Sequence, residues 1–116
     1  MKVIYHIALR EEWERARRVG AYRGDTLDTE GFIHCSTQEQ VIRVANALFR
    51  GERGLVLLCI DPGRLRAYVH HEAAEGGEQF PHIYGPLNVE AVVRVLEFEP
   101  GKDGEFELPE GAAVVG

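Results

Sequence analysis

The sequence predicts a small α+β domain in which two helices come early and strands dominate the later part of the chain. Apolar residues recur at helical spacing twice before residue 50, a wholly apolar run covers 55–60, and β-type segments follow it. The chain has 116 residues, 45% of them hydrophobic, which fits one domain over residues 1–116 with a core of its own.

The first of the two helices follows a strand. Residues 3–8 are mostly β-branched or aromatic and predict a strand. Apolar residues then recur at helical spacing up to Gly20, which is a natural helix stop. The polar stretch 22–30 predicts an exposed loop, and residues 31–35 predict a short second strand.

Ser36 and Glu39 have the spacing of a capping box and predict that the second helix starts near Thr37. In this arrangement the Ser36 hydroxyl accepts from the Glu39 amide, and the Glu39 carboxylate accepts from the Ser36 amide. The apolar stripe behind them ends near Gly51. Capping alone explains Ser36, although a capping serine can also turn its hydroxyl to a ligand.

Strands fill the rest of the chain. Residues 55–60 are apolar on both faces, which is typical of a central strand covered from two sides. Residues 66–72 alternate, 91–98 predict another strand, and 106–108 allow a last short one. Between them, the Pro- and Gly-punctuated segment 80–88 predicts a rigid loop.

Charge and cysteine usage narrow the class of protein. The formal net charge of −6 predicts an acidic surface that repels phosphate backbones, so we do not expect general nucleic-acid binding. Cys35 and Cys59 lie in apolar runs and predict buried free thiols. The first residues are too short and polar for a signal peptide, and no apolar run reaches the roughly 20 residues of a membrane helix. We therefore expect a cytoplasmic protein without membrane contact.

Three histidines stand where apolar residues would be expected. His6 and His34 interrupt apolar strands, and His34 precedes a helix N-terminus, which favours negative charge. His82 and Tyr84 flank Ile83 and share one face of an extended segment, where such aromatic side chains suit stacking and hydrogen bonding. We expect His6, His34 and His82 to line one ligand site, the alternatives being a hydrogen-bonded core histidine and a merely structural loop.

Other chemistry has less support in the sequence. Three neutral imidazoles could bind zinc, but no His or Cys pair has metal-ligand spacing, so we expect no metal. His70 and His71 point to opposite faces of one strand and are expected to be solvent-exposed. Glu72, at the end of that strand, is a weaker candidate for a site carboxylate. The chain has no Gly-rich phosphate loop, Walker motif or nucleophile elbow.

Several motifs occur in the order of a known family: Tyr5-His6-Ile7, Gly31 to Ser36, and Phe80 to Asn88. Over nearly its whole length, the chain resembles the small bacterial family called domain of unknown function 952. That family is similar to a compact ADP-ribosyltransferase fold, a split β-sandwich that binds NAD in a cleft. The resemblance implies this fold, with the two early helices, and NAD as a cofactor, but it does not imply an activity.

The resemblance also implies roles for individual residues. In the wider ADP-ribosyltransferase group, a first-strand residue contacts a ribose, a second polar residue follows on a later strand, and a late Glu often completes the catalytic set. Carried over by motif, His6 takes the first role and His34 the second, while Glu72 and Glu90 compete for the third. The expected ligand contacts are Ser36, His82, Tyr84 and Asn88.

Two functions follow from these expectations. The first is an ADP-ribosyltransferase-like domain that binds NAD or a related nucleotide and transfers ADP-ribose or a phosphate. The second is a non-catalytic module that binds a nucleotide or another small metabolite. A carboxylate of Glu72 or Glu90 beside His34 would favour transfer, because a positioned negative charge stabilises the oxocarbenium-like transition state.

Overall fold

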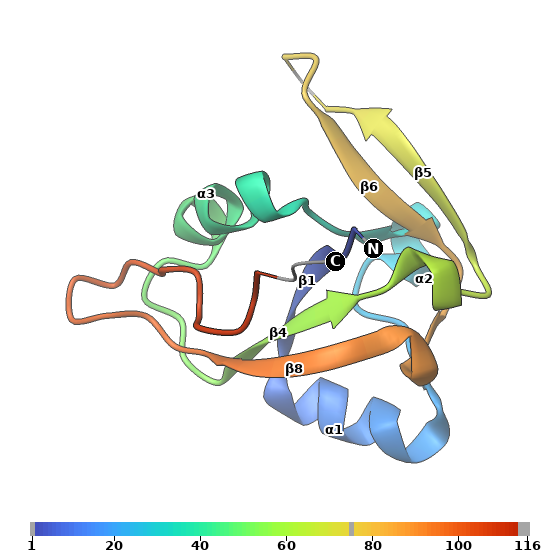
Figure 1. Ribbon diagram of the computed structural model, residues 1–116, viewed down its shortest axis with the longest axis horizontal. Helices are drawn as coiled ribbons and strands as arrows, with labels where there is room; N and C mark the ends of the chain where they lie inside the picture. Colours follow the sequence, from blue (N-terminus) through green and yellow to red (C-terminus); the bar gives the residue numbers. More distant parts are fainter. Residues whose placement is uncertain (1, 75, 114–116) are drawn as a thin grey trace.

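The computed structural model describes residues 2–74 and 76–113 (Figure 1). Its main sheet is antiparallel, with strand order β1-β4-β8: β1 spans Ile4–Leu9, β4 spans Leu55–Ile60 and β8 spans Val92–Phe98. Helix α1 (Arg10–Val19) covers one face of this sheet, and helix α3 (Gln38–Leu48) covers the other. This arrangement confirms the α+β class.

β4 is buried on both faces, as its apolar sequence predicts. Val56, Leu58 and Ile60 pack into the cluster that contains Trp13 of α1. The alternate residues Leu55, Leu57 and Cys59 pack into a second cluster with Val41 and Ala45 of α3. Since β4 is held from both sides, its neighbour β1 is fixed as an edge strand of a rigid sheet.

A second antiparallel sheet has the order β3-β6-β5, and β2 pairs with β7. The hairpin of β5 and β6 extends away from the main sheet (Figure 1). The bounds are β2 Ala21–Tyr22, α2 Leu27–Glu30, β3 Ile33–His34, β5 Tyr68–Ala73, β6 Gln79–Tyr84 and β7 Leu87–Asn88, with 3-10 turns at Pro62–Arg64 and Val89–Ala91. In the described part of the chain, no helix is long and apolar enough to cross a bilayer.

The predicted rigid loop over 80–88 is wrong, because this segment forms β6 and β7. Pro81 lies inside β6, a position that normally costs a sheet hydrogen bond. Its carbonyl accepts from the amide of Cys35 at 3.0 Å, so both its backbone groups face the β3 side. The position of the missing N–H of Pro81 therefore faces the β3 side, just beyond the last residue of β3, His34. The ladder between β6 and β5 loses no hydrogen bond.

Two further expectations are corrected. Residues 22–30 are not simply an exposed loop: Tyr22 is buried in β2 and a short helix follows it. Residues 106–108 form no strand, because the side chain of Asn46 replaces a partner strand. The amide of Phe106 donates to Asn46 Oδ1 at 2.7 Å, and Asn46 Nδ2 donates to the Phe106 carbonyl at 3.4 Å.

The capping box of α3 lies one residue later than predicted. Thr37 is the N-cap residue, and its amide donates to Gln40 Oε1 at 3.0 Å. Gln40 is buried, and its Nε2 also donates to the carbonyl of Gln79 at 2.7 Å. Glu39 is exposed, and Ser36 does not cap the helix. Gln40 thus joins the start of α3 to the start of β6.

This geometry predicts that Gln40→Ala lowers the free energy of unfolding by about 1–3 kcal/mol, because two partly buried hydrogen bonds to the backbone are lost. Glu39→Ala is the matched control and should change stability by less than about 0.5 kcal/mol. Urea denaturation followed by circular dichroism measures both variants. Equal losses would contradict the assignment of Gln40 as the residue that completes the cap.

Candidate functional site

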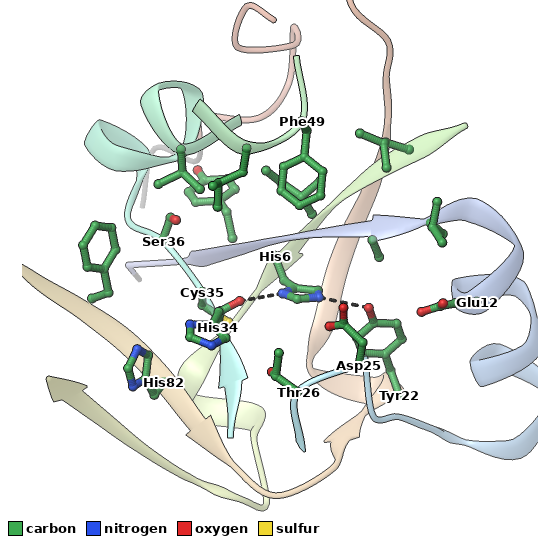
Figure 2. A pocket seen from close by; sticks show the side chains of 18 of the residues that line it. His6, Glu12, Tyr22, Asp25, Thr26, His34, Cys35, Ser36, Phe49 and His82 are labelled. Carbon is green, nitrogen blue, oxygen red and sulfur yellow. Dashed lines mark hydrogen bonds between the residues drawn. The ribbon is translucent and has the colours of Figure 1, made fainter. Parts of the chain in front are cut away.

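A cleft of about 720 Å³ lies along β1, between α3 and the second sheet (Figure 2). Near its start, β1 is bridged by Ser36, whose backbone exchanges two 2.8 Å hydrogen bonds with Tyr5. Ile7 lies two residues further along β1, so its N–H and C=O point to the same outer edge of the strand as those of Tyr5. The described residues place no strand against Ile7 there, and its backbone donor and acceptor therefore face the cleft.

His6, in the middle of the cleft, makes a hydrogen bond through each ring nitrogen. Nδ1 lies 2.6 Å from the carbonyl oxygen of His34, and Nε2 lies 2.9 Å from the hydroxyl of Tyr22. A carbonyl can only accept, so Nδ1 carries the hydrogen, and Nε2 of the neutral ring accepts from Tyr22. Burial lowers the pKa of His6 and raises the pKa of Tyr22, so both groups are neutral at pH 7.

One end of the cleft carries carboxylates. Figure 2 shows Glu12 of α1 and Asp25, which follows β2, close to the Tyr22 ring. After burial, their negative charges are the next causes of the raised pKa of Tyr22. Among the described residues that line the cleft, none is Arg or Lys. This end is therefore negative and rich in hydrogen-bond acceptors.

The other end carries two histidines on adjacent strands. His34 of β3 and His82 of β6 are direct cross-strand partners, with ring centroids 5.1 Å apart. Glu30 lies 3.1 Å from His34 Nε2, and Glu72 lies 2.9 Å from His82 Nδ1. The ring of Phe32 stacks on His82 at 4.1 Å. Each histidine thus has one nitrogen held by a carboxylate and a second without a partner among the described residues.

Ser36 lines the cleft beside these histidines and is only 6% exposed. Its hydroxyl makes no hydrogen bond to a described residue, and it keeps access to the cleft because no described side-chain oxygen or nitrogen is both buried and without a partner. Burying a hydroxyl without a partner is unfavourable unless water or a ligand supplies one. The Ser36 hydroxyl is therefore available to a ligand.

The wall formed by α3 is apolar. Val44, Leu48 and Phe49 line it, and Leu9 at the end of β1 lies along the same cleft. Leu48 is 71% exposed and Leu9 is 46% exposed, although both are large aliphatic side chains. The cleft is thus amphipathic, with polar groups on the His6 side and an open apolar rim on the α3 side.

Four of the residues chosen from the sequence come together in this cleft: His6, His34, Ser36 and His82. Tyr84 lies next to the group but does not line the cleft, and its hydroxyl donates to Glu72 in a short hydrogen bond.

Two other chosen residues lie elsewhere. Asn88 is buried, accepts from the Arg66 amide and donates to the Arg64 carbonyl, both at 3.0 Å, so it holds a turn. Glu90 is exposed and forms an ion pair with Arg66 at 3.2 Å. Of the two carboxylates considered for the third catalytic position, only Glu72 is near the site, and it contacts His82 instead of facing His34.

The sequence did not point to Glu12, Tyr22 or Asp25. Tyr22 carried one signal, because it is a lone aromatic residue in a polar stretch between Gly20 and Gly24. Glu12 and Asp25 were hidden in the general acidic excess. Within the described ranges, no three His, Cys, Asp or Glu side chains are arranged to hold a metal ion.

The state of His6 predicts a pH dependence of stability. Its pKa in the folded protein lies below the ordinary value of 6.5, so the unfolded chain binds a proton that the folded chain refuses. The free energy of unfolding should therefore decrease as the pH falls below about 6.5. Denaturation curves between pH 7 and pH 5 measure this loss. The loss should be smaller in His6→Gln and should persist in the control His71→Gln, whose side chain is exposed. If the dependence of the free energy of unfolding on pH is unchanged in His6→Gln, His6 is not the neutral group responsible.

Comparison with known proteins places the chain in a family. A crystal structure of protein CC0527 from Caulobacter crescentus is 39% identical, with a TM-score of 0.83 over 91% of this chain and 94% of that one. A solution NMR structure of CC0527 gives a TM-score of 0.76 at 39% identity, covering 93% and 94% of the two chains. No curated protein matches significantly. Residues 7–95 match the family described as protein of unknown function DUF952, and the chain therefore belongs to that family.

Proposed function

We propose that this domain binds a small organic molecule in the cleft along β1. One observation carries the proposal: polar groups that the fold does not use face a single cleft of metabolite size. They are the Ser36 hydroxyl, the Ile7 backbone and the second nitrogens of His34 and His82. The volume of about 720 Å³ lies within the usual range of small-molecule sites.

The apolar rim supports the same proposal. Leu48 and Phe49 on α3 offer hydrophobic surface to a ligand, while the polar groups opposite fix its orientation. His6 is held at both nitrogens, so it positions Tyr22 and the His34 backbone and offers no ring nitrogen of its own. The cleft can thus hold a ligand with an apolar part and a hydrogen-bonding part.

ADP-ribosyltransferase-like transfer from NAD has less support in this geometry. A pyrophosphate is normally bound by Arg, Lys or a helix N-terminus, whereas the ionisable acids Glu12, Asp25 and Glu52 line this cleft without any Arg or Lys from the described residues. Glu90 points elsewhere, and Glu72 is engaged with His82. A binding module is therefore the better proposal, and NAD serves as one probe of it.

Nuclear magnetic resonance of the labelled protein tests this proposal with a fragment panel that includes adenosine, ADP-ribose and NAD. We expect at least one compound to shift the amide resonances of Ile7, Ser36 and Leu48. Ser36→Ala should weaken that compound by about tenfold, equivalent to one lost hydrogen bond. The melting temperature should stay near that of the parent protein, because Ser36 does not cap α3.

His70→Ala is the matched control. His70 lies beside His82 in the second sheet, but it is exposed and does not line the cleft. It should leave the affinity unchanged. If no compound shifts the cleft resonances, or if all shifts lie on the outer part of the β5–β6 hairpin, the proposal is wrong. Release of nicotinamide from NAD would instead favour transfer.

A further inference from the structure

We infer that the ligand is an organic cation whose ammonium group binds between Glu12 and Asp25, with its apolar part lying against α3. This inference rests on the proposed function and specifies the chemical class of the ligand. It is carried by the charges that line the cleft, by the direction of the hydrogen bonds at that end, and by Ser36, a residue only 6% exposed whose hydroxyl has no partner among the described residues.

The charges along the cleft have one sign. Glu12, Asp25 and Glu52 line it, and none of them forms an ion pair with a described residue. Ten of the fifteen described carboxylates that do not line the cleft have an Arg or His partner. Because burial lowers the pKa of His6, that ring adds no positive charge in the middle of the cleft. A cation entering this end would meet uncompensated negative charge.

The hydroxyl groups at this end also act as acceptors. Tyr22 gives its hydrogen to His6 Nε2, so the lone pairs of its oxygen remain for another donor. Thr26, which also lines the cleft, gives its hydrogen to the carbonyl of Phe32 at 2.7 Å. An ammonium group has three N–H donors and no acceptor, which matches two carboxylates and two hydroxyl oxygens. A phosphate or carboxylate would find no donor among these four side chains.

Ser36 gives independent evidence that a ligand enters the cleft. The residue is only 6% exposed, and its hydroxyl has no partner among the described residues but keeps access to the cleft. It lies at the opposite end from Glu12 in Figure 2, with His6 between them. A ligand that reaches from the carboxylates to Ser36 would pass the apolar rim of Leu48 and Phe49. The inferred ligand is therefore an amphipathic amine.

Three probes that share the phenethyl group test this inference: phenethylamine is a cation, 2-phenylethanol is neutral and 3-phenylpropionate is an anion. Titrations followed by the amide resonances of Ile7 and Asp25 give the three affinities. We expect phenethylamine to bind about tenfold or more tightly than 2-phenylethanol, and 3-phenylpropionate to bind most weakly. Added salt should weaken only the amine appreciably.

Variants of the carboxylates supply the controls. The double variant Glu12→Gln with Asp25→Asn should bring the affinity for phenethylamine to within about twofold of that for 2-phenylethanol. Glu11→Gln removes the same charge from the neighbouring position of α1, which is exposed and does not line the cleft, and it should keep the preference for the amine.

The outcomes separate this inference from the proposed function. If 2-phenylethanol or 3-phenylpropionate binds as tightly as phenethylamine, judged by the amide resonances of the cleft, the cleft does not select a cation and this inference is wrong. The proposed function, binding in the cleft, would still stand. If none of the three probes binds but another fragment does, the inference is likewise overturned. If neither these probes nor the fragment panel perturbs the cleft, the proposed function fails together with it.

Discussion

The hydrogen bond from His6 Nδ1 to the carbonyl oxygen of His34 is the constraint on which the cleft depends. It joins the edge strand of the main sheet to the short strand β3 of the second sheet. It also fixes the tautomer of His6, which in turn makes Tyr22 a donor toward the ring. An apolar residue at position 6 would leave a carbonyl and a phenol without partners, and the polarity of the whole cleft would change.

Much of the fold was predictable because local patterns determine it. The run over residues 55–60 could only be a strand covered on both sides, and α1 ends at Gly20, which adopts a left-handed conformation with φ of 95°. The convergence of three histidines was predictable for a related reason. His6, His34 and His82 interrupt apolar or extended segments in the sequence, and all three line one cleft, although the side chain of His34 is half exposed.

The rest depended on contacts between distant parts of the chain. The sequence favoured Ser36 as the cap of α3, but the backbone of Ser36 is bridged to Tyr5 and Thr37 takes the N-cap position instead. Tyr22 belongs to the site only because β2 pairs with β7, which brings its hydroxyl within hydrogen-bond distance of His6 Nε2. The likeness to ADP-ribosyltransferases remains a prediction, because the matching structures belong to a protein whose description names no activity.

Strand β1, along which the cleft lies, also has consequences for how the chain folds. β1 pairs with β4 about fifty positions later, and the buried hydroxyl of Tyr5 donates to the carbonyl of Ala112 at 2.6 Å, 107 positions along the chain. Contacts of such sequence separation require large loops to close before they stabilise anything, which slows folding. We therefore expect the hairpin of β5 and β6 to form early and β1 to be locked last, so that a ligand of the cleft recognises only the fully folded chain.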